Sequence, residues 1–254
     1  MNLALIGGTG LYNSELFQAS TKKKVKTPFG TVKVYQGKKG DNKIVFLPRH
    51  GKHHSIPPHK INYRANIYAL KILDISRIIS ANSVGSINPN LHPGDIVIPH
   101  DFIDFTKHRI LTFYDEEAVH IDVSTPYCND IRQNIIKSQA TIVPQGVYAC
   151  TEGPRFETPS EIKMLQTLGA DVVGMTGIPE TTLAREMGLC YASVCTVTNY
   201  GAGMSDQKLT SKEVVEMMGK NTGKINDICR EIIQSLQNDK RCQCKGSIEL
   251  ARVK

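Results

Sequence analysis

The stretch that decides the fold is residues 171–198, DVVGMTGIPETTLAREMGLCYASVCTVT. Residues 171–175 and 189–198 are short apolar runs, which predict buried strands, and the intervening residues 179–187 are predicted to be helical. A strand, a helix and a strand in close succession predict a βαβ unit. The two strands are therefore expected to lie parallel in a central sheet.

The same pattern extends to both sides of this unit. Apolar and alternating runs predict strands at residues 3–6, 30–37, 43–48, 77–81, 95–99 and 146–151, with 30–37 and 43–48 forming a hairpin. Helical spacing or a capping residue predicts helices over 62–73 and 129–139, from Thr158, and from Thr210 or Ser211. We expect an α/β fold: a single domain with a mostly parallel, mixed central sheet flanked by helices.

Length and composition favour one domain. With 254 residues, 40% of them hydrophobic, the chain can bury one substantial core. We assign residues 1–238 to this domain and residues 239–254 to a basic, mobile C-terminal tail. No apolar run reaches the roughly 18 residues of a membrane span, and the first residues lack the pattern of a signal peptide, so we expect a cytoplasmic protein without a membrane partner.

The formal charge of +7 does not indicate nucleic-acid binding. The excess is concentrated in residues 22–26, 38–39 and 240–254, and such runs are typical of solvated loops and tails. Trp is absent and no aromatic residues are interleaved among the lysines. An anionic small substrate explains the positive balance equally well.

No metal site is predicted. The seven cysteines lie mostly in apolar runs, which favours buried free thiols, and the Cys242-Gln-Cys244 pair is too isolated to supply four ligands. The histidine-dense segment 50–59 lacks the spacing of a helical His-x-x-x-His motif.

Two segments near the N-terminus have the chemistry of an oxyanion site. Gly7-Gly8-Thr9-Gly10 follows a predicted strand, so its N–H groups and the Thr9 hydroxyl could bind an anion, although a plain turn explains the glycines as well. It matches neither the dinucleotide-binding nor the P-loop motif. Arg49 and His50 follow another strand and offer a guanidinium fork and an imidazole donor for a tetrahedral oxyanion.

Three later segments could bind a flat heterocycle. In residues 152–158, EGPRFET, Phe156 could stack on a ring while Glu157 accepts a ring N–H, unless the segment is only a capping turn. The loops at Met175–Thr176 and at Asn199, Tyr200 and Gly201 follow predicted strands, and ligands gather at such strand ends, although Met175 could equally be a core residue.

Taken together, these segments resemble the methylthioadenosine and purine nucleoside phosphorylase family. The resemblance covers residues 3 to 238 and is carried, in family order, by IGGTG, RHG with KHHSIPPHKINYRANI, NSVGS, TEGPRFET, VVGMTGIPE and TNYGAG. It implies that phosphate is held by Thr9, Arg49, His50, Ser83 and Thr176, with Ser83 in a turn after the 77–81 strand. It also implies that Met175 packs beneath the ribose and that Phe156 lies against the base.

The resemblance also bears on the choice of base. The 6-amino branch of the family typically has Asp at position 199, a second Asp near 201 and Ser at 157, whereas this chain has Asn199, Gly201 and Glu157. Glu157 could accept the N1–H of a 6-oxopurine and Asn199 could donate to O6 and N7, while the bare N1 of adenine would face a carboxylate. We therefore expect hypoxanthine, then guanine, in preference to adenine.

The sugar end resembles the methylthio branch, in which a His-containing loop of the neighbouring subunit closes the 5′ pocket; His120 is the matching residue. The combined signature implies phosphorolysis of S-methyl-5′-thioinosine to hypoxanthine and 5-methylthioribose 1-phosphate by a homotrimer. Phosphate is a co-substrate, no cofactor is expected, and Asn199, Glu157 and His50 are the expected catalytic residues. The alternatives are inosine or guanosine phosphorolysis, methylthioadenosine phosphorolysis, phosphate-free hydrolysis, and a non-catalytic nucleoside-binding protein.

Overall fold

The structure is a computed structural model that describes residues 2–8, 20–40, 42–51, 54–138, 141–206, 210–235, 242–249 and 251–252. Its strands are β1 (Asn2–Gly7), β2 (Thr21–Thr27), β3 (Gly30–Lys39), β4 (Asn42–Pro48), β5 (Arg77–Ser86), β6 (Ile96–Val97), β7 (Asp101–Phe105), β8 (Ile142–Val143), β9 (Val147–Thr151), β10 (Val172–Gly174) and β11 (Cys190–Tyr200). Its helices are α1 (Tyr63–Ile72), α2 (Asn129–Ser138), α3 (Pro159–Thr167), α4 (Glu180–Glu186) and α5 (Ser211–Ser235), with short 3-10 turns η4 (Pro58–Lys60) and η5 (Cys244–Gly246).

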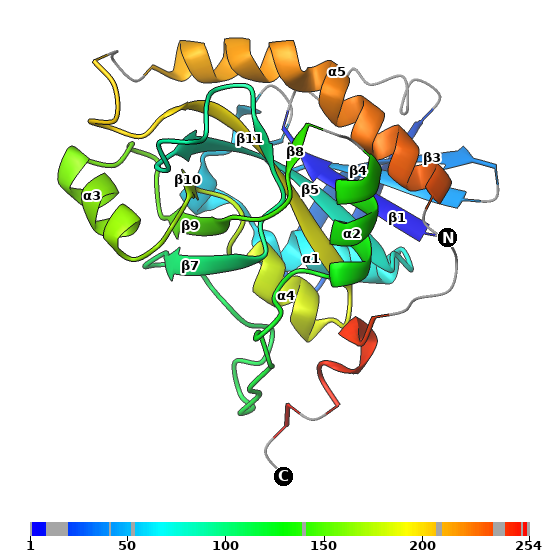
Figure 1. Cartoon of the computed structure of the whole chain (residues 1–254). Coiled ribbons are helices and arrows are strands. Elements are labelled where there is room, and N and C mark those ends of the chain that lie inside the picture. The colour runs from blue at the N-terminus through cyan, green and yellow to red at the C-terminus, as the bar shows by residue number, and fades with distance from the viewer. Residues whose placement is uncertain are drawn as a thin grey trace.

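The strands form one mixed sheet with helices around it (Figure 1). Its main path runs β2-β3-β4-β1-β5-β10-β9-β7, and β11 pairs with β5 and β6. Six of the ten strand pairings are parallel, including β1–β4, β1–β5 and β5–β11. The predicted α/β architecture with a mostly parallel, mixed sheet is confirmed.

The alternation of side chains along β1 explains the two helical layers. Leu3 and Leu5 face one side and pack in a cluster with residues of α2 and α5, whereas Ala4 and Ile6 face the other side with residues of α1 and α4. All four side chains are fully buried. A strand covered on both faces needs a continuous apolar run, which is why residues 3–6 of β1 are all hydrophobic.

Two helix starts follow the predicted capping chemistry. The Thr158 hydroxyl accepts the N–H of Glu161 and the Glu161 carboxylate accepts the N–H of Thr158, so the pair forms a capping box at the start of α3. Thr210 and Glu213 make the same reciprocal bonds at the start of α5. Both predicted starts are confirmed, and for α5 the capping residue is Thr210.

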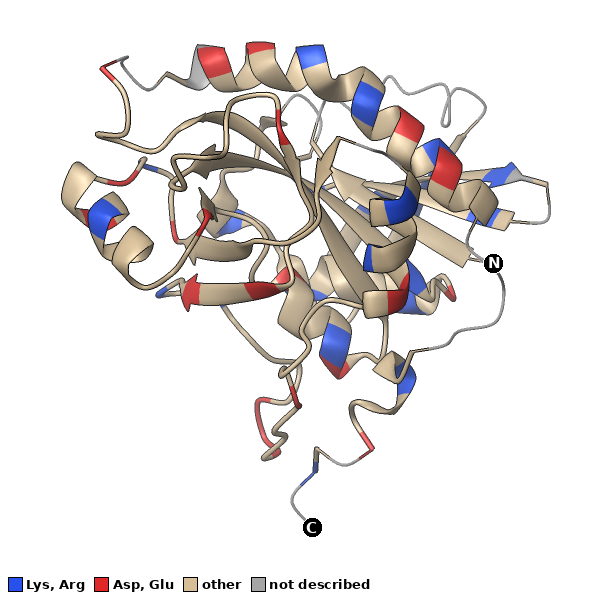
Figure 2. Cartoon of the chain, in the orientation of Figure 1, with Lys and Arg blue, Asp and Glu red and all other residues tan. Residues whose placement is uncertain are grey.

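Two sequence-based assignments of loops are wrong. The basic run 22–26 is not a solvated loop but most of β2, an edge strand whose lysines are exposed and whose Val25 is buried against the sheet. Elsewhere positive and negative residues are interspersed, as Figure 2 shows along α5. Lysines are compatible with an edge strand because their charges face solvent and discourage pairing with another chain. The segment after Ala81 is not a turn, because β5 continues through it to Ser86.

The segment assigned to a basic tail contacts the domain in its described part, residues 242–249 and 251–252. Cys244 is buried, the Ser247 hydroxyl donates to the carbonyl of Arg185, and the His120 N–H donates to the carbonyl of Ala251. Within the described residues, no helix is both long and apolar enough to cross a membrane.

Candidate active site

The first part of the site lies where the parallel strands β1 and β4 end together beside the middle of β5. Arg49 follows β4 directly and donates its backbone N–H to the carbonyl of Gly7, the last residue of β1. The register of β1 with β5 brings Ile6 beside Ser80. The predicted oxyanion residues of β1 and β4 therefore meet at one edge of the sheet, although Thr9 itself is outside the described residues.

Arg49 is held in place by a buried ion pair that the sequence analysis missed. Its guanidinium binds Glu180 through Nε–Oε1 at 2.6 Å and Nη2–Oε2 at 3.0 Å, and it also donates to Ser80 Oγ and to the carbonyl of Ala81. Burial opposes the charge on Arg49, but the ion pair with Glu180 outweighs it and raises the pKa of Arg49 above its ordinary value. Of the five N–H donors of the fork, these bonds use four and leave one for a ligand.

Glu180 is in turn fixed by two hydroxyl donors besides Arg49. Ser80 Oγ donates to its Oε2 at 3.1 Å and Tyr191 Oη donates at 2.9 Å. The carboxylate is fully buried, so these bonds replace the water it has lost. Arg49 therefore presents a fixed positive charge beside the ends of β1 and β4, and its fork is not open to an anion on both arms.

His50 is a neutral imidazole in this environment. Burial, then the charge of Arg49 and the stacked ring of His54 at 4.0 Å, lower the pKa of His50 to about 3. Its Nδ1 lies 2.9 Å from the carbonyl oxygen of Ile56, which can only accept, so Nδ1 carries the proton. The free Nε2 then offers a lone pair, so His50 presents an acceptor and not the donor assumed from the sequence. A phosphate that still carries a proton is the complementary ligand.

The lowered pKa of His50 predicts a pH dependence of stability. The ring titrates near 6.5 when unfolded and near 3 when folded, so between these values the unfolded chain binds a proton that the folded chain does not. This contribution to stability is complete above pH 6.5 and is lost as pH falls toward 3. Between pH 7.5 and 5, the wild type should lose about 2 kcal/mol more unfolding free energy than His50→Asn. Urea denaturation at the two pH values measures this, and equal losses would contradict it.

Thr176 joins this group through Asn82. Thr176 follows β10, is buried, and donates from Oγ1 to Asn82 Oδ1 at 2.9 Å. Asn82 also bonds Ser80 at 3.2 Å, which links it to the Arg49–Glu180 pair. Ser83 is the next residue of a regular strand, so its side chain points to the opposite face of the sheet. The structure therefore brings Asn82, and not the Ser83 hydroxyl, to Thr176.

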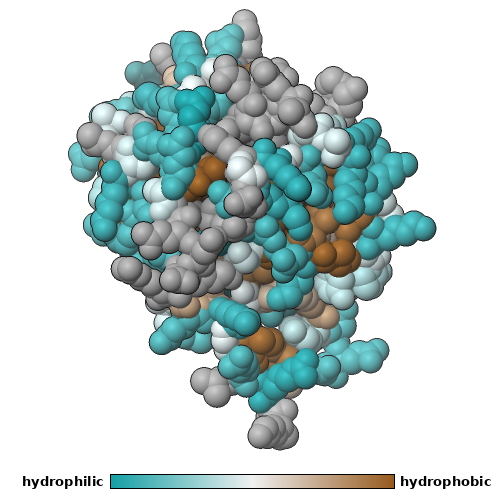
Figure 3. Space-filling view, turned by 90° about the vertical axis from the view of Figure 1, so that its right-hand side faces the viewer, coloured by the Kyte–Doolittle hydropathy of each residue, from teal (hydrophilic) through white to brown (hydrophobic). Residues whose placement is uncertain are grey.

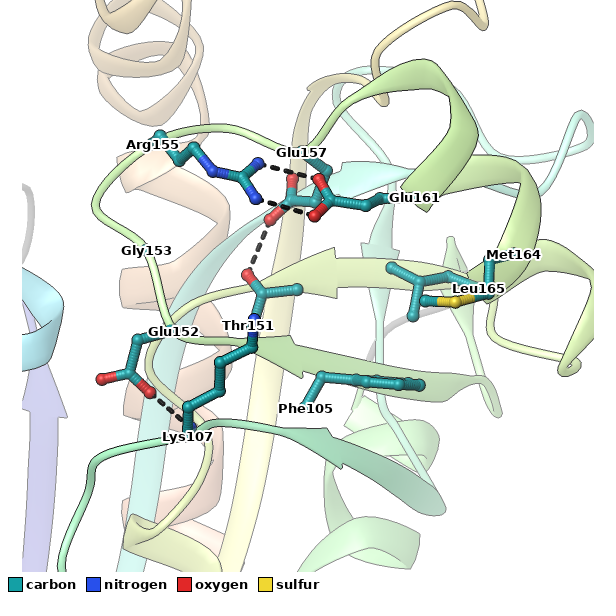
Figure 4. Close-up of a pocket in the computed structure, with 10 residues that line it drawn as sticks. All are labelled: Phe105, Lys107, Thr151, Glu152, Gly153, Arg155, Glu157, Glu161, Met164 and Leu165. Atoms are coloured by element: carbon teal, nitrogen blue, oxygen red, sulfur yellow. Dashed lines mark hydrogen bonds and ion pairs between the residues drawn. The ribbon is translucent and has the colours of Figure 1, made fainter.

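The second part of the site is a cavity of about 300 Å³ near the end of β9 (Figure 4). Glu157 lies at its wall and accepts a hydrogen bond from Thr151 Oγ1 at 2.6 Å. Figure 4 shows this pair and the Arg155–Glu161 ion pair on the polar side, with Phe105, Met164 and Leu165 forming the apolar side. Such a mixture of apolar wall and few polar groups suits a flat heterocycle. Phe156 is half-buried and is not among the residues that line this cavity.

Asn199 lies where β11 loses its regular register with β5, between Val197 and Asn199. Such bulges turn a side chain away from the strand pattern and are common beside active sites. Its Oδ1 accepts from the Thr198 hydroxyl at 2.8 Å and its Nδ2 donates to the Tyr200 carbonyl at 2.9 Å. One amide N–H is left for a ligand. Tyr200 itself bonds His92 Nδ1 through its hydroxyl at 2.9 Å.

Gly201 has no room for a side chain. A Cβ at this position would lie 2.9 Å from Ile87 Cγ2 and 3.1 Å from the Ser86 carbonyl oxygen. An aspartate here would force the Ile87 side chain and the Ser86 carbonyl to shift.

Of the remaining predicted site residues, Met175 lies close to Glu157 and His120 does not. A Cβ on Gly153, which has a φ of +64°, would come within 2.6 Å of Met175 Sδ, so Met175 packs directly under the loop that carries Glu157. His120 is exposed on the long connection between β7 and α2, which leaves the body of the domain in Figure 1. Within a single chain, no described contact joins His120 to Glu157 or Asn199.

The isolation assumed for the Cys242–Cys244 pair is wrong. The sulfur atoms of Cys128, Cys190, Cys242 and Cys244 all lie within 4.8 Å of one another, away from the residues described above. The sequence could not show this because three segments far apart in the chain supply the four thiols.

The fold and the site define a class: an α/β enzyme that holds an oxyanion and a polar heterocycle at the carboxyl edge of a mixed sheet. A family model described as "Phosphorylase superfamily" matches residues 2–234, and the chain belongs to this family. It is therefore an enzyme of the nucleoside phosphorylase type, a pentosyltransferase.

Named relatives cover nearly the whole chain. A probable S-methyl-5′-thioinosine phosphorylase of Methanothermobacter thermautotrophicus is 47% identical over 99% of this chain and 90% of its own length. A 6-oxopurine nucleoside phosphorylase of Pyrococcus furiosus is 49% identical over 97% of each chain. A solved methylthioadenosine phosphorylase from Schistosoma mansoni in complex with adenine superposes with a TM-score of 0.93 at 32% identity, covering 99% of both chains.

Proposed function

We propose that this enzyme cleaves 6-oxopurine nucleosides with inorganic phosphate, and that S-methyl-5′-thioinosine is its preferred substrate. The observation that supports the 6-oxo choice is the Glu157 carboxylate at the wall of the cavity, with its Oε1 already bonded to Thr151. Its remaining oxygen can accept the N1–H of hypoxanthine or guanine, whereas adenine has no hydrogen at N1. The names of the relatives at 47% and 49% identity are consistent with this choice.

The reaction needs phosphate beside the strand ends that carry Arg49, His50 and Thr176. A phosphate oxygen attacks the anomeric carbon as the bond to the purine nitrogen breaks, through an oxocarbenium-like transition state. The fixed charge of Arg49 attracts the phosphate, and neutral His50 accepts a hydrogen bond at Nε2 from the proton that the phosphate carries. The bonding electrons leave with the purine, and the free N–H of Asn199 donates to N7 or O6 as negative charge develops there. The purine anion then takes up a proton from solvent and the sugar phosphate releases the proton it carried, which leaves the free base and the pentose 1-phosphate.

A second candidate is the phosphorolysis of inosine and guanosine, because the relative from Pyrococcus furiosus is named for 6-oxopurine nucleosides in general. The two candidates differ only at the 5′ position of the sugar. We propose that His120 from a neighbouring subunit of a homotrimer closes this position, since His120 is exposed and far along the chain from the base site. We further propose a cytoplasmic location, because reduced thiols are typical of that compartment and all seven cysteines are free.

A panel of three nucleosides tests the proposal. With phosphate, kcat/KM on S-methyl-5′-thioinosine should exceed that on S-methyl-5′-thioadenosine at least about 100-fold, because adenine leaves Glu157 facing a bare ring nitrogen. Inosine should fall between them. Release of the base should stop when phosphate is omitted. Equal rates on the 6-oxo and 6-amino compounds, or undiminished release without phosphate, would refute it.

A further inference from the structure

Four cysteine thiols converge at a site outside the nucleoside and phosphate pockets. The Sγ atoms of Cys128, Cys190, Cys242 and Cys244 lie within 4.8 Å of one another, and those of Cys190 and Cys242 are 3.3 Å apart. All four are free cysteines. Cys128, Cys190 and Cys244 are 0–3% exposed, and Cys242 packs against the same apolar cluster.

The fold brings these thiols together from three separate elements. Cys128 directly precedes α2, Cys190 begins β11, and Cys242 and Cys244 belong to the C-terminal segment, where Cys244 begins η5. The first two lie on the domain body and the last two on the segment that reaches it. The cluster therefore lies at the junction between the body and the C-terminal segment.

The spacing of the sulfurs fits one central ion better than two separate bonds. Four thiolates about 2.3 Å from a tetrahedral Zn²⁺ are about 3.8 Å from one another. The Cys190–Cys242 separation of 3.3 Å is slightly shorter than this, and all the sulfur–sulfur separations are within 4.8 Å. A disulfide only requires its two sulfur atoms to lie about 2.05 Å apart. Two separate disulfides would therefore not require all four sulfur atoms to lie close together.

Zn²⁺ with four thiolates carries a net charge of −2. Positive groups lie near the four cysteines and reduce the cost of burying this charge. Arg77 is the register partner of Cys190 in the β5–β11 pairing and brings a buried guanidinium to the same end of the strand, where it shares its charge with Asp130, 3.4 Å away. The N-terminus of α2, directly after Cys128, presents the positive end of a helix dipole. Lys245 directly follows Cys244.

We propose that Cys128, Cys190, Cys242 and Cys244 bind one structural Zn²⁺ that fastens the C-terminal segment to the domain. On binding, the four thiols lose four protons to solvent and form four Zn–S bonds, with no change in oxidation state. Four thiolates would leave no coordination position of the ion for a substrate or water, so the centre is closed and has no part in the transfer reaction.

The body of the domain is shaped to receive the segment that this centre would fasten. Gly188 has a φ of +65°, and a Cβ there would lie 2.9 Å from the Lys245 carbonyl oxygen, so the segment seats against a bare backbone. Beyond the cysteines, Ser247 bonds the Arg185 carbonyl and Ala251 bonds the N–H of His120. The zinc centre thus secures contacts at the C-terminal end of α4 and on the loop that carries His120.

Metal analysis of the full-length chain, purified without an affinity tag, tests the proposal. We expect one zinc per chain by plasma mass spectrometry, released when a mercurial reagent blocks the thiols. Cys244→Ser and Cys128→Ser should each lose most of the zinc. The matched control is Cys229→Ser, because Cys229 is equally buried in the same apolar cluster but is not one of the four thiols, and it should keep the zinc.

Three results would overturn the assignment: two disulfides among the four cysteines by mass spectrometry under non-reducing conditions, four free thiols that take up no added Zn²⁺, or iron in place of zinc. If the serine variants do not fold, stripping the wild type with a chelator provides the same test. The stripped protein should melt about 10 °C lower, and added Zn²⁺ should restore the melting temperature. Trypsin should cut after Lys245 at least about tenfold faster in the stripped protein. Melting and cleavage unchanged by stripping would refute the anchoring role.

Discussion

Glu157→Gln should lower kcat/KM on the 6-oxopurine nucleoside by about 100-fold. The hydrogen bond from N1–H to the charged carboxylate contributes roughly 1.5–3 kcal/mol, and most of this is lost with the neutral amide. Activity on the 6-amino nucleoside should stay level or rise, since the amide can donate to the bare N1 that the carboxylate repels. The ratio of kcat/KM on the 6-oxo nucleoside to that on the 6-amino nucleoside should therefore fall toward one. Steady-state kinetics on both compounds measures the change.

Glu161→Gln is the matched control for this substitution. Glu161 lines the same cavity and loses the same charge, but its carboxylate is occupied by Arg155 and by the cap of α3. It should change the ratio of the two activities by less than about threefold, in line with a surface ion pair. If Glu161→Gln shifts the ratio as much as Glu157→Gln, the preference comes from the overall charge of the cavity and not from a bond between Glu157 and the base.

Glu180→Ala should destabilise the fold by about 3–5 kcal/mol, because it leaves the guanidinium of Arg49 buried without its counter-charge. Arg49 is 3% exposed and Glu180 is fully buried, so water cannot replace the lost partner without opening the core. The variant should also bind phosphate more weakly, since Arg49 is then no longer fixed. Chemical denaturation and the KM for phosphate report the two effects.

An ion pair on the surface serves as the comparison for the buried Arg49–Glu180 pair. Asp227 and Arg230 on α5 form an ion pair at 2.9 Å with both side chains largely exposed, so Asp227→Ala should cost no more than about 0.5 kcal/mol. Replacing both members of the buried pair, as in Arg49→Met with Glu180→Leu, should recover much of the lost stability while abolishing activity. A double variant no more stable than Glu180→Ala would show that the cost lies in packing rather than in the uncompensated charge.

The elements that the sequence predicted well are those with a strong local signal. The capping box at Thr158 and Glu161 and the apolar strand that begins at Cys190 are set by neighbouring residues, and both are present. β2 was missed because four of its seven residues are lysines, and an edge strand needs only one buried side chain, Val25, on the sheet. The end of β5 was misjudged because Asn82 and Ser83 are typical of turns, yet here Asn82 is buried between β11 and the Thr176 loop.

The sequence indicated several residues of the candidate site, but not the ion pair and hydrogen bonds that connect them. Arg49, His50 and Thr176 follow strand ends in the sequence, which is a local signal. Glu180 lies 131 residues from its partner, and nothing near it in the chain indicates an ion pair. The available sign was weak: a carboxylate at the start of a predicted helix, four residues after the candidate anion-binding residue Thr176. The state of the His50 ring depends on the Ile56 carbonyl and on burial, which only the folded chain supplies.

The lysine-bearing edge strand β2 has a consequence for assembly. It lies at one end of the sheet order and β7 at the other, and Figure 3, which looks onto the side of the molecule where β3 lies in Figure 1, shows a largely hydrophilic surface with small, separate apolar areas. Exposed Ile110 and Leu111 instead follow β7 on the connection toward α2. We therefore expect subunits to meet at the β7 end. There each copy would present His120 to a neighbour, while β2 at the opposite rim takes no part in the interface, so that the oligomer closes instead of growing into a fibre.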